Sequence, residues 1–106
     1  DDQVIPLLSL GGVGVISVLS NVAPRETHDM VAKYLEGDTK GALDIQLRAL
    51  PLAEALFCEV NPIPVKAAMN LMGKDVGPLR APLSVMDDKY TEKLARALKD
   101  FGLALA

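Results

Sequence analysis

The stretch Leu10-Gly-Gly-Val-Gly-Val-Ile-Ser-Val-Leu-Ser-Asn21 decides the fold of this chain. Within it, Val13–Leu19 is almost continuously apolar and rich in β-branched residues, without the alternation of a half-exposed strand. This pattern predicts a strand covered on both faces, as in the parallel sheets of α/β proteins. No other segment predicts a strand, so its backbone groups have no partner within the sequence. We therefore expect the strand to pair with another chain or, as we favour, with the rest of a larger protein.

The segments on both sides of this strand predict helices. Residues 2–10 predict a short helix that either Asp1 or Asp2 caps, and a glycine pair then ends it. A second helix begins at Pro24, because proline is favoured in the first helical turn, and its apolar residues recur at helical spacing. The N-terminal part of the chain, residues 1–37, therefore reads as helix, strand and helix.

The remaining residues, 38–106, predict three helices and no strand. Their expected bounds are about Asp38–Val60, Val65–Met72 and Asp87 or Asp88 to Gly102, with Asp38 as the first N-cap. The apolar surface of the first of these helices is so wide that we expect burial on two sides. Two proline-rich segments, Asn61–Pro64 and Gly77–Leu83, predict extended connections.

Composition excludes several classes of function. The chain has 106 residues, half of them apolar, which suits one domain with a modest core. Its net charge is -3 and its eleven Lys and Arg residues are scattered, so nucleic-acid binding is not expected. The run from Val4 to Pro24 lacks charge, but Pro6 and three glycines interrupt it, so we expect no membrane segment.

Reactive side chains are few and isolated. Cys58 lies in an apolar run without a neighbouring histidine, which predicts a buried structural thiol and fits the reducing cytoplasm. His28, the only histidine, is expected either to face solvent or to be satisfied structurally, without a metal or catalytic role. Lys66 lies in the first turn of a predicted helix with nothing to desolvate it, so a catalytic role is not expected. No metal-ligand spacing occurs, and we expect no metal or cofactor.

The polar residues around the predicted strand allow two interpretations. The glycines of Gly11-Gly-Val-Gly14 precede the strand, whereas a phosphate-binding glycine loop follows one, so we interpret them as a tight helix-to-strand turn. Ser17, Ser20 and Asn21 lie near the carboxyl end of the strand, where barrel enzymes place ligand contacts. For Ser20 and Asn21, capping and turn formation explain the residue types equally well.

Three motifs together resemble one enzyme family. The run Leu8-Ser-Leu-Gly-Gly-Val-Gly-Val-Ile-Ser-Val-Leu-Ser-Asn-Val-Ala-Pro24 resembles the last strand region of dihydrodipicolinate synthase. Asn61-Pro-Ile-Pro-Val-Lys66 resembles a second signature of that family. Gly77-Pro-Leu-Arg-Ala-Pro-Leu83, with a capped helix ending Leu98-Lys-Asp-Phe-Gly-Leu103, resembles its C-terminus. The resemblance extends over nearly the whole chain, in the same order.

This resemblance implies a fold. Family members are α/β proteins, (β/α)8 TIM barrels with a C-terminal helical extension, and the chain resembles the C-terminal third of one. Val13–Leu19 corresponds to the eighth barrel strand, whose neighbours are strands seven and one. Residues 1–37 correspond to the end of the barrel, and residues 38–106 to the three-helix extension. The chain itself is expected to be mainly helical with one strand.

The resemblance also implies a chemistry. These enzymes condense pyruvate with aspartate semialdehyde in lysine biosynthesis, through a Schiff base on a lysine of the sixth strand. That lysine and the other catalytic groups of the family lie upstream of Asp1, so the resemblance implies no catalytic residue here and an inactive isolated chain. Tyr34 and Tyr90 do not match the family's catalytic tyrosines. The matching site position is Ile16, whose backbone carbonyl faces the pyruvate pocket in the family.

Two alternatives remain open at this point. The parent could be an aldolase of the N-acetylneuraminate lyase type, since that enzyme belongs to the same wider family. The chain could also be a non-enzymatic helical module that pairs its strand between copies in a homo-oligomer. We favour the fragment of a cytoplasmic lyase, associated with its N-terminal part or with further copies of itself.

Overall fold

Helix α3 (Thr39–Leu56) is the element around which the computed structural model of residues 1–106 is organised. The Asp38 carboxylate accepts a hydrogen bond from the Gly41 N–H at 2.9 Å, which confirms the predicted N-cap. The helix ends at Leu56 rather than near Val60, and residues 57–62 form turns and bends that lead to the next helix.

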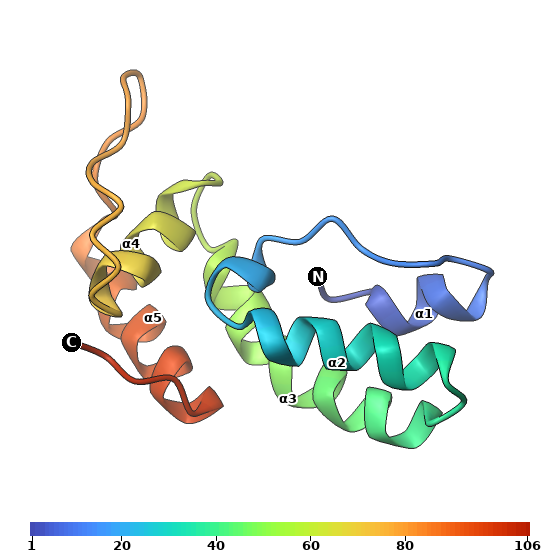
Figure 1. Cartoon of the computed structure of the whole chain (residues 1–106). Coiled ribbons are helices and arrows are strands. Elements are labelled where there is room, and N and C mark those ends of the chain that lie inside the picture. The colour runs from blue at the N-terminus through green and yellow to red at the C-terminus, as the bar shows by residue number, and fades with distance from the viewer.

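Five further elements surround α3, and none is a strand (Figure 1). They are α1 (Val4–Ser9), the single 3-10 turn η1 (Leu19–Asn21), α2 (Pro24–Leu35), α4 (Ile63–Leu71) and α5 (Asp88–Phe101). The helices start and stop close to the predicted positions, and Pro24 begins α2 as expected. No helix combines the length and the apolarity that crossing a bilayer requires.

The predicted strand is the main correction. Residues 12–17 have no regular secondary structure and run as a drawn-out loop above α1 and α2 (Figure 1). A strand exists only through hydrogen bonds to a neighbouring strand, and the chain offers no such neighbour. The prediction of a buried strand over Val13–Leu19 is therefore wrong for this chain alone, whose described structure is helical.

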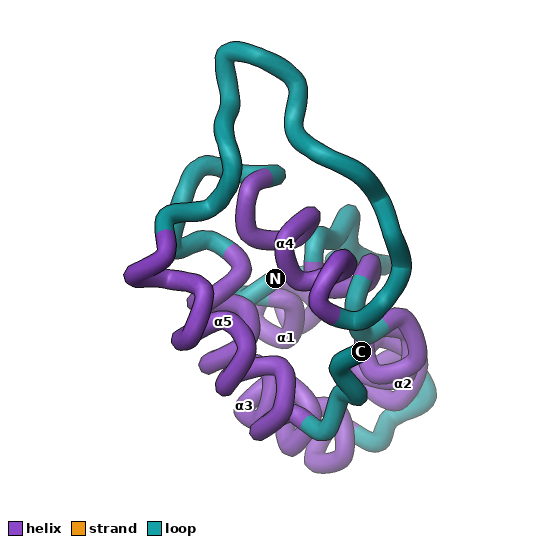
Figure 2. Tube along the Cα trace, turned by 90° about the vertical axis from the view of Figure 1, so that its left-hand side faces the viewer, coloured by secondary structure: helices purple, strands orange, loops and turns teal.

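The core lies where α3 meets α2 on one side and α5 on the other (Figure 2). Its largest fully buried side chains are Leu19, Met30, Leu52, Leu56, Leu94, Leu98, Val22 and Pro64. Leu52 and Leu56 are neighbours at i, i+4 on α3, so one face of this helix supplies the centre of the core.

The opposite face of α3 is open. Leu43, Leu47, Leu50 and Phe57 remain 36–54% exposed. The sequence predicts burial of this wide apolar surface between two partners, and α3 does lie between α2 and α5. These four side chains lie outside the area that the two helices cover.

The long connection between α4 and α5 stands out from the helices as a loop, which is seen edge-on in Figure 1 and open in Figure 2. Asn70 fastens its base, because its side-chain amide donates to the Gly77 carbonyl at 3.1 Å and accepts from the Val76 N–H at 2.8 Å. The connection predicted for Gly77–Leu83 has no helix or strand, but it is not extended throughout, because it turns at Arg80–Leu83, where the Leu83 N–H donates to the Arg80 carbonyl at 3.0 Å. The other proline segment differs from its prediction, because α4 already begins at Ile63.

The last helix confirms the predicted stop and start signals. The Asp87 side chain accepts a hydrogen bond from the Lys89 N–H at 3.1 Å, which makes Asp87, not Asp88, the N-cap of α5. Gly102 ends the helix with φ +103°, a left-handed conformation that favours glycine. The amphipathic helix between these residues buries Leu94, Ala97, Leu98 and Phe101.

We predict that Asp38→Ala lowers the free energy of unfolding of the 106-residue chain by about 1 kcal/mol, because α3 loses its side-chain cap. Urea denaturation followed by circular dichroism measures this loss. Asp44→Ala is the matched control, since it removes only the exposed Lys40–Asp44 ion pair and should cost less than about 0.5 kcal/mol. Equal effects of the two substitutions would contradict the assigned role of Asp38.

Candidate functional site

The glycines after α1 form a helix-ending turn. The Gly12 N–H donates to the Leu7 carbonyl at 3.0 Å and the Gly11 N–H to the Leu8 carbonyl at 3.1 Å, which is the Schellman pattern. Gly11 has φ +100°, and a Cβ at Gly12 would lie 2.8 Å from the Leu7 carbonyl oxygen. Both positions therefore require glycine for backbone reasons, as the interpretation of this motif as a tight turn expects.

The backbone that follows this turn, Val13–Ile16, makes no hydrogen bonds within the chain, and we call it the free segment. No N–H or C=O group from Val13 to Ile16 takes part in a hydrogen bond within the chain. Val13 is 85% exposed and Val15 is 37% exposed. This short segment thus exposes both its apolar side chains and its backbone donors and acceptors, which is an unstable combination in water.

Ile16 ends the free segment. Its side chain is fully exposed and its backbone carbonyl accepts no hydrogen bond from the chain. The predicted role of this carbonyl at a pyruvate pocket stays a prediction, but the carbonyl is unoccupied by any protein donor.

A compact hydrogen-bonded turn begins at the next residue. Ser17 Oγ accepts from the Ser20 N–H at 3.0 Å, and Ser20 Oγ donates to the Ser17 carbonyl at 2.9 Å. The Asn21 side-chain amide donates to the Val18 carbonyl at 3.0 Å. Of the two interpretations for Ser20 and Asn21, the structure supports turn formation.

The Asp1 carboxylate, distant in sequence, accepts hydrogen bonds from this turn. Its Oδ2 accepts hydrogen bonds from the Val18 N–H at 3.0 Å and the Leu19 N–H at 2.9 Å, and its Oδ1 accepts from Ser17 Oγ. The prediction that Asp1 or Asp2 caps α1 is therefore wrong. The N-cap of α1 is Gln3, which makes no side-chain cap, because the Asp1 carboxylate is taken up by the N–H groups at the start of η1.

Gln46 ties Asp1 to α3. This buried side chain donates from Nε2 to the Asp1 carbonyl at 3.0 Å and accepts at Oε1 from the Ile5 N–H at 3.1 Å. The sequence reasoning missed both Asp1 and Gln46 as partners of the strand region. A signal was present, because Gln46 is a polar residue beside the apolar face of a helix, where a buried amide needs hydrogen-bond partners.

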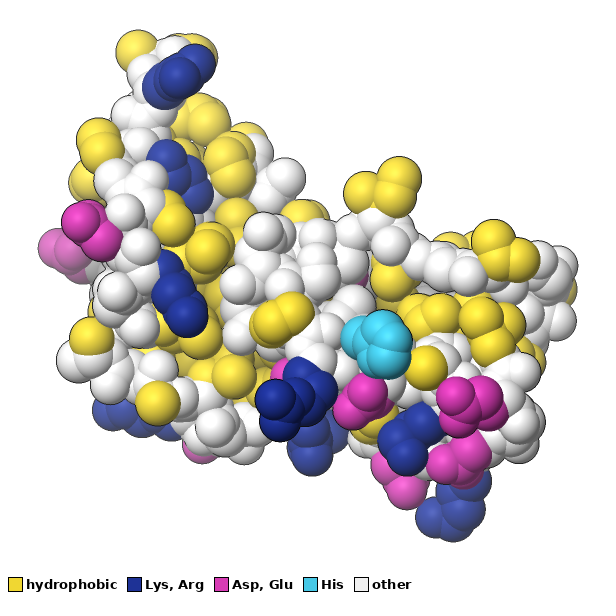
Figure 3. Space-filling view, in the orientation of Figure 1, with side chains coloured by type: hydrophobic (Ala, Val, Ile, Leu, Met, Phe, Trp, Pro, Cys, Tyr) yellow, Lys and Arg dark blue, Asp and Glu magenta, His cyan; other side chains and the backbone are white.

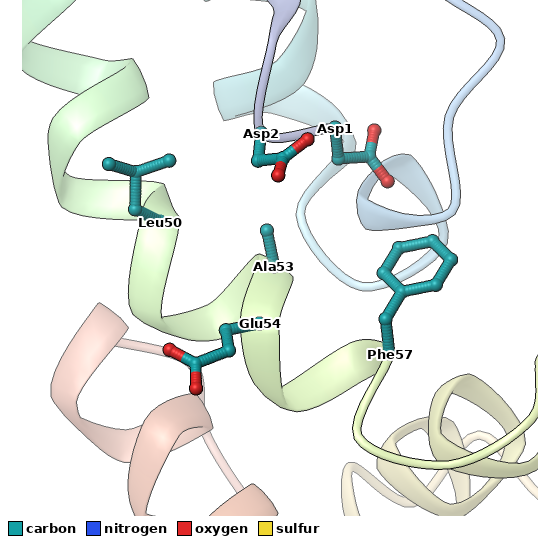
Figure 4. Close-up of a pocket in the computed structure, with 6 residues that line it drawn as sticks. All are labelled: Asp1, Asp2, Leu50, Ala53, Glu54 and Phe57. Atoms are coloured by element: carbon teal, nitrogen blue, oxygen red, sulfur yellow. The ribbon is translucent and has the colours of Figure 1, made fainter.

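A surface pocket of about 520 Å³ lies beside these residues (Figure 4). It is lined by Asp1, Asp2, Leu50, Ala53, Glu54 and Phe57. The Asp1 carboxylate points away from the pocket towards η1 (Figure 4). The lining contains no histidine, cysteine, lysine or serine, and its acid–base side chains are the carboxylates of Asp1, Asp2 and Glu54. The Asp1 carboxylate is already engaged by the N–H groups of Val18 and Leu19.

The other candidate side chains lie outside this region and take part in hydrogen bonding or core packing. Lys66 Nζ donates to the Pro78 carbonyl at 2.6 Å and so braces the base of the α4–α5 loop. Tyr34 on α2 and Tyr90 on α5 pack against the hydrophobic core. None of these three residues is hydrogen bonded to the turn at Ser17.

The potential metal ligands are dispersed. His28 is exposed to solvent (cyan in Figure 3), which is one of the two expected outcomes, and its one hydrogen-bond and ion-pair partner is the Asp29 carboxylate, at 3.2 Å. No group of three or more His, Cys, Asp or Glu side chains could hold a metal ion. The structure thus gives no set of residues for a bound metal.

Cys58 is half-buried and packs against the core rather than being fully buried. Desolvation by this burial raises the pKa of the Cys58 thiol above its usual value, and Glu59 adds to the rise, while Lys93 opposes it. A raised pKa keeps the thiol protonated near neutral pH, which suits a structural cysteine and not a nucleophile.

We predict that the rate of Cys58 alkylation by iodoacetamide increases with pH. The midpoint pH of this increase should be higher in the folded chain than in the urea-unfolded chain. The reason is that the thiolate is the reacting form, and burial disfavours it. Lys93→Met should raise the midpoint further, since it removes the opposing positive charge. A folded midpoint at or below the unfolded one would contradict this assignment.

Comparisons with known proteins match nearly the whole chain to one family. A model of the Dihydrodipicolinate synthetase family matches residues 1–101. The 4-hydroxy-tetrahydrodipicolinate synthase of Lachnoclostridium phytofermentans is 64% identical over 103 residues, which cover 97% of this chain and 35% of that protein. The protein of the same name from Caldicellulosiruptor bescii is 54% identical over 105 residues, covering 99% of this chain and 36% of that protein.

Solved structures agree with the curated relatives. Dihydrodipicolinate synthase from Thermotoga maritima superposes with a TM-score of 0.94 at 46% identity, over 97% of this chain and 35% of that one. The synthase from Aquifex aeolicus gives a TM-score of 0.93 at 39% identity, over 98% and 36% of the two chains. These solved relatives are TIM-barrel enzymes, and this chain spans little more than a third of their length. With both motif order and three-dimensional structure in agreement, the chain belongs to the dihydrodipicolinate synthetase family.

Proposed function

We propose that this chain is the C-terminal part of a lyase that condenses pyruvate with aspartate semialdehyde in lysine and diaminopimelate biosynthesis. The curated relatives that carry the name of that synthase support it, and they favour it over an N-acetylneuraminate lyase. Residues 1–37 then contribute the end of a (β/α)8 barrel, and residues 38–106 form the helical extension.

The free segment Val13–Ile16 is the observation that carries this proposal. Its unpaired backbone and exposed apolar side chains are what a barrel strand presents when its two neighbours are not there. In the full enzyme, strands seven and one would take up both edges. A closed barrel leaves no edge unpaired, which removes the cost of exposing this segment.

Ile16 is the proposed contact with substrate. Active sites of TIM barrels lie at the carboxyl ends of the strands, and Ile16 is the last residue before the turn that ends this segment. Its carbonyl has no donor within the chain. We therefore infer that this carbonyl lines the pyruvate pocket. Pyruvate has no N–H or O–H group, so the carbonyl would accept its hydrogen bond from the protonated nitrogen of the Schiff base that pyruvate forms with the lysine.

The covalent chemistry belongs to the rest of the parent protein. A Schiff-base lysine needs desolvation or a neighbouring cation to lower its pKa. Each lysine of this chain is at least partly exposed, and Lys66 is engaged by the Pro78 carbonyl. We propose that the isolated chain is inactive, needs no cofactor, and acts in the cytoplasm only as part of the assembled barrel.

The test joins this chain at Asp1 to the upstream two thirds of the Lachnoclostridium phytofermentans relative. We predict that the chimera consumes pyruvate and aspartate semialdehyde in a coupled assay, because the two parts complete one barrel. The 106-residue chain alone should show no turnover. With pyruvate and borohydride it should also show no covalent adduct by intact mass spectrometry.

Two outcomes overturn the proposed function. One is a chimera that folds, as judged by circular dichroism and size-exclusion chromatography, but has no lyase activity. The other is turnover or a trapped pyruvate adduct in the isolated chain. The native relative provides the reference for the assay.

The role of Ile16 has its own test in the chimera. Replacing the Ile16–Ser17 amide by an ester, through suppression with an α-hydroxy acid, weakens the Ile16 carbonyl as an acceptor. We predict that the KM for pyruvate rises about fivefold, the effect of one net hydrogen bond. Steady-state kinetics with varied pyruvate measure this change.

Two controls distinguish the effect of the Ile16 carbonyl on the KM for pyruvate from effects of the backbone N–H and of the side chain. An ester at the Gly14–Val15 bond also removes one backbone donor of the segment but leaves the Ile16 carbonyl unchanged. Ile16→Val alters the side chain and keeps the amide. A KM that rises as much in either control as in the Ile16–Ser17 ester would contradict the assignment.

A further inference from the structure

The side chain of Gln46 is a buried amide with both ends engaged. It is 4% exposed, its Nε2 donates to the Asp1 carbonyl at 3.0 Å, and its Oε1 accepts from the Ile5 N–H at 3.1 Å. Because a carbonyl only accepts and an N–H only donates, the orientation of the amide is fixed. Gln46 thus holds two backbone segments at the N-terminal end of α1 from a position on α3.

Asp1 carries this restraint to the turn after the free segment. Its backbone carbonyl is held by Gln46, and its carboxylate binds the N–H groups of Val18 and Leu19 and the hydroxyl of Ser17. Hydrogen bonds to an ionised carboxylate are among the stronger ones in proteins. Gln46, Asp1 and the η1 turn therefore form one continuous network.

Ser17 is where this network reaches the backbone of Ile16. The Ile16 carbonyl and the Ser17 N–H belong to the same planar peptide unit. Ser17 is restrained through its Oγ, by Asp1 and the Ser20 N–H, and through its own carbonyl, by Ser20 Oγ. Restraining Ser17 on these two groups limits the directions in which the Ile16 carbonyl can point.

We propose that Gln46 is a positioning residue of the lyase: through Asp1 and Ser17 it orients the Ile16 carbonyl towards pyruvate. This inference rests on the proposed function. It assigns to the helical extension, residues 38–106, a role at the pocket of a barrel to which it does not itself contribute a strand. Gln46 does not touch substrate in this proposal and acts only through its neighbours.

The test uses Gln46→Leu in the same chimera. Leucine fills a similar volume but leaves the Asp1 carbonyl and the Ile5 N–H without their partner. We predict that the KM for pyruvate rises about fivefold, as for loss of one hydrogen bond, while the KM for aspartate semialdehyde is unchanged. Leu94→Ala is the control, because it removes a buried core side chain of α5 outside the network.

A purely structural role for Gln46 gives a different result. Destabilisation lowers the fraction of active enzyme, and so the apparent kcat, without separating the two KM values. Leu94→Ala should behave in that way. If Gln46→Leu leaves the KM for pyruvate unchanged, or raises both KM values together, the inference is overturned even though the chimera is active.

Hydrogen exchange of the 106-residue chain gives a readout that does not depend on lyase activity. In Gln46→Leu, the Val18 and Leu19 amides should exchange about tenfold faster than in the parent chain, because the Asp1 carboxylate is no longer held in place. Unchanged exchange at both amides overturns the proposed network. A folded but inactive unsubstituted chimera overturns the proposed function and, with it, the role of Gln46 towards pyruvate.

Discussion

The close packing of α3 is the interaction on which the rest of the structure depends. This helix contacts every other element of the chain. Ala42, Ala49, Ala53 and Ala55 on its surface are buried, and such small side chains let neighbouring helices approach closely. Because α3 is shared, the helices before it and after it are fixed to each other although their sequences are far apart. The network through Gln46 is one result of that arrangement.

A second constraint comes from the backbone of Val13–Ile16. Its polar groups can be satisfied by water in this chain, but its apolar side chains cannot be shielded at the same time. Pairing with two further strands, as in the proposed barrel, would meet both needs together. The chain spans little more than a third of the length of its relatives, which fits that proposal.

Elements fixed by local chemistry could be predicted from the sequence. Asp38, Pro24 and Gly102 act through their own turn of chain, so their residue types were sufficient to place the helix ends. The predicted strand failed for the opposite reason, since Val13–Leu19 has the correct composition but a strand also needs a partner. Asp1 was assigned to the wrong helix, because an N-cap rule considers only neighbours in sequence. Its actual partners, Val18 and Leu19, are brought to it by tertiary packing.

The Schellman turn at Gly11-Gly12 and the capped turn at Ser17 together have a consequence for assembly. They fasten the free segment at both ends, so its path across α1 and α2 is largely set before any neighbouring strand arrives. Much of the conformational entropy that strand pairing normally removes is already lost in this chain. Docking of the adjoining strands should therefore resemble binding to a preorganised template, in which affinity increases because little ordering remains to be done.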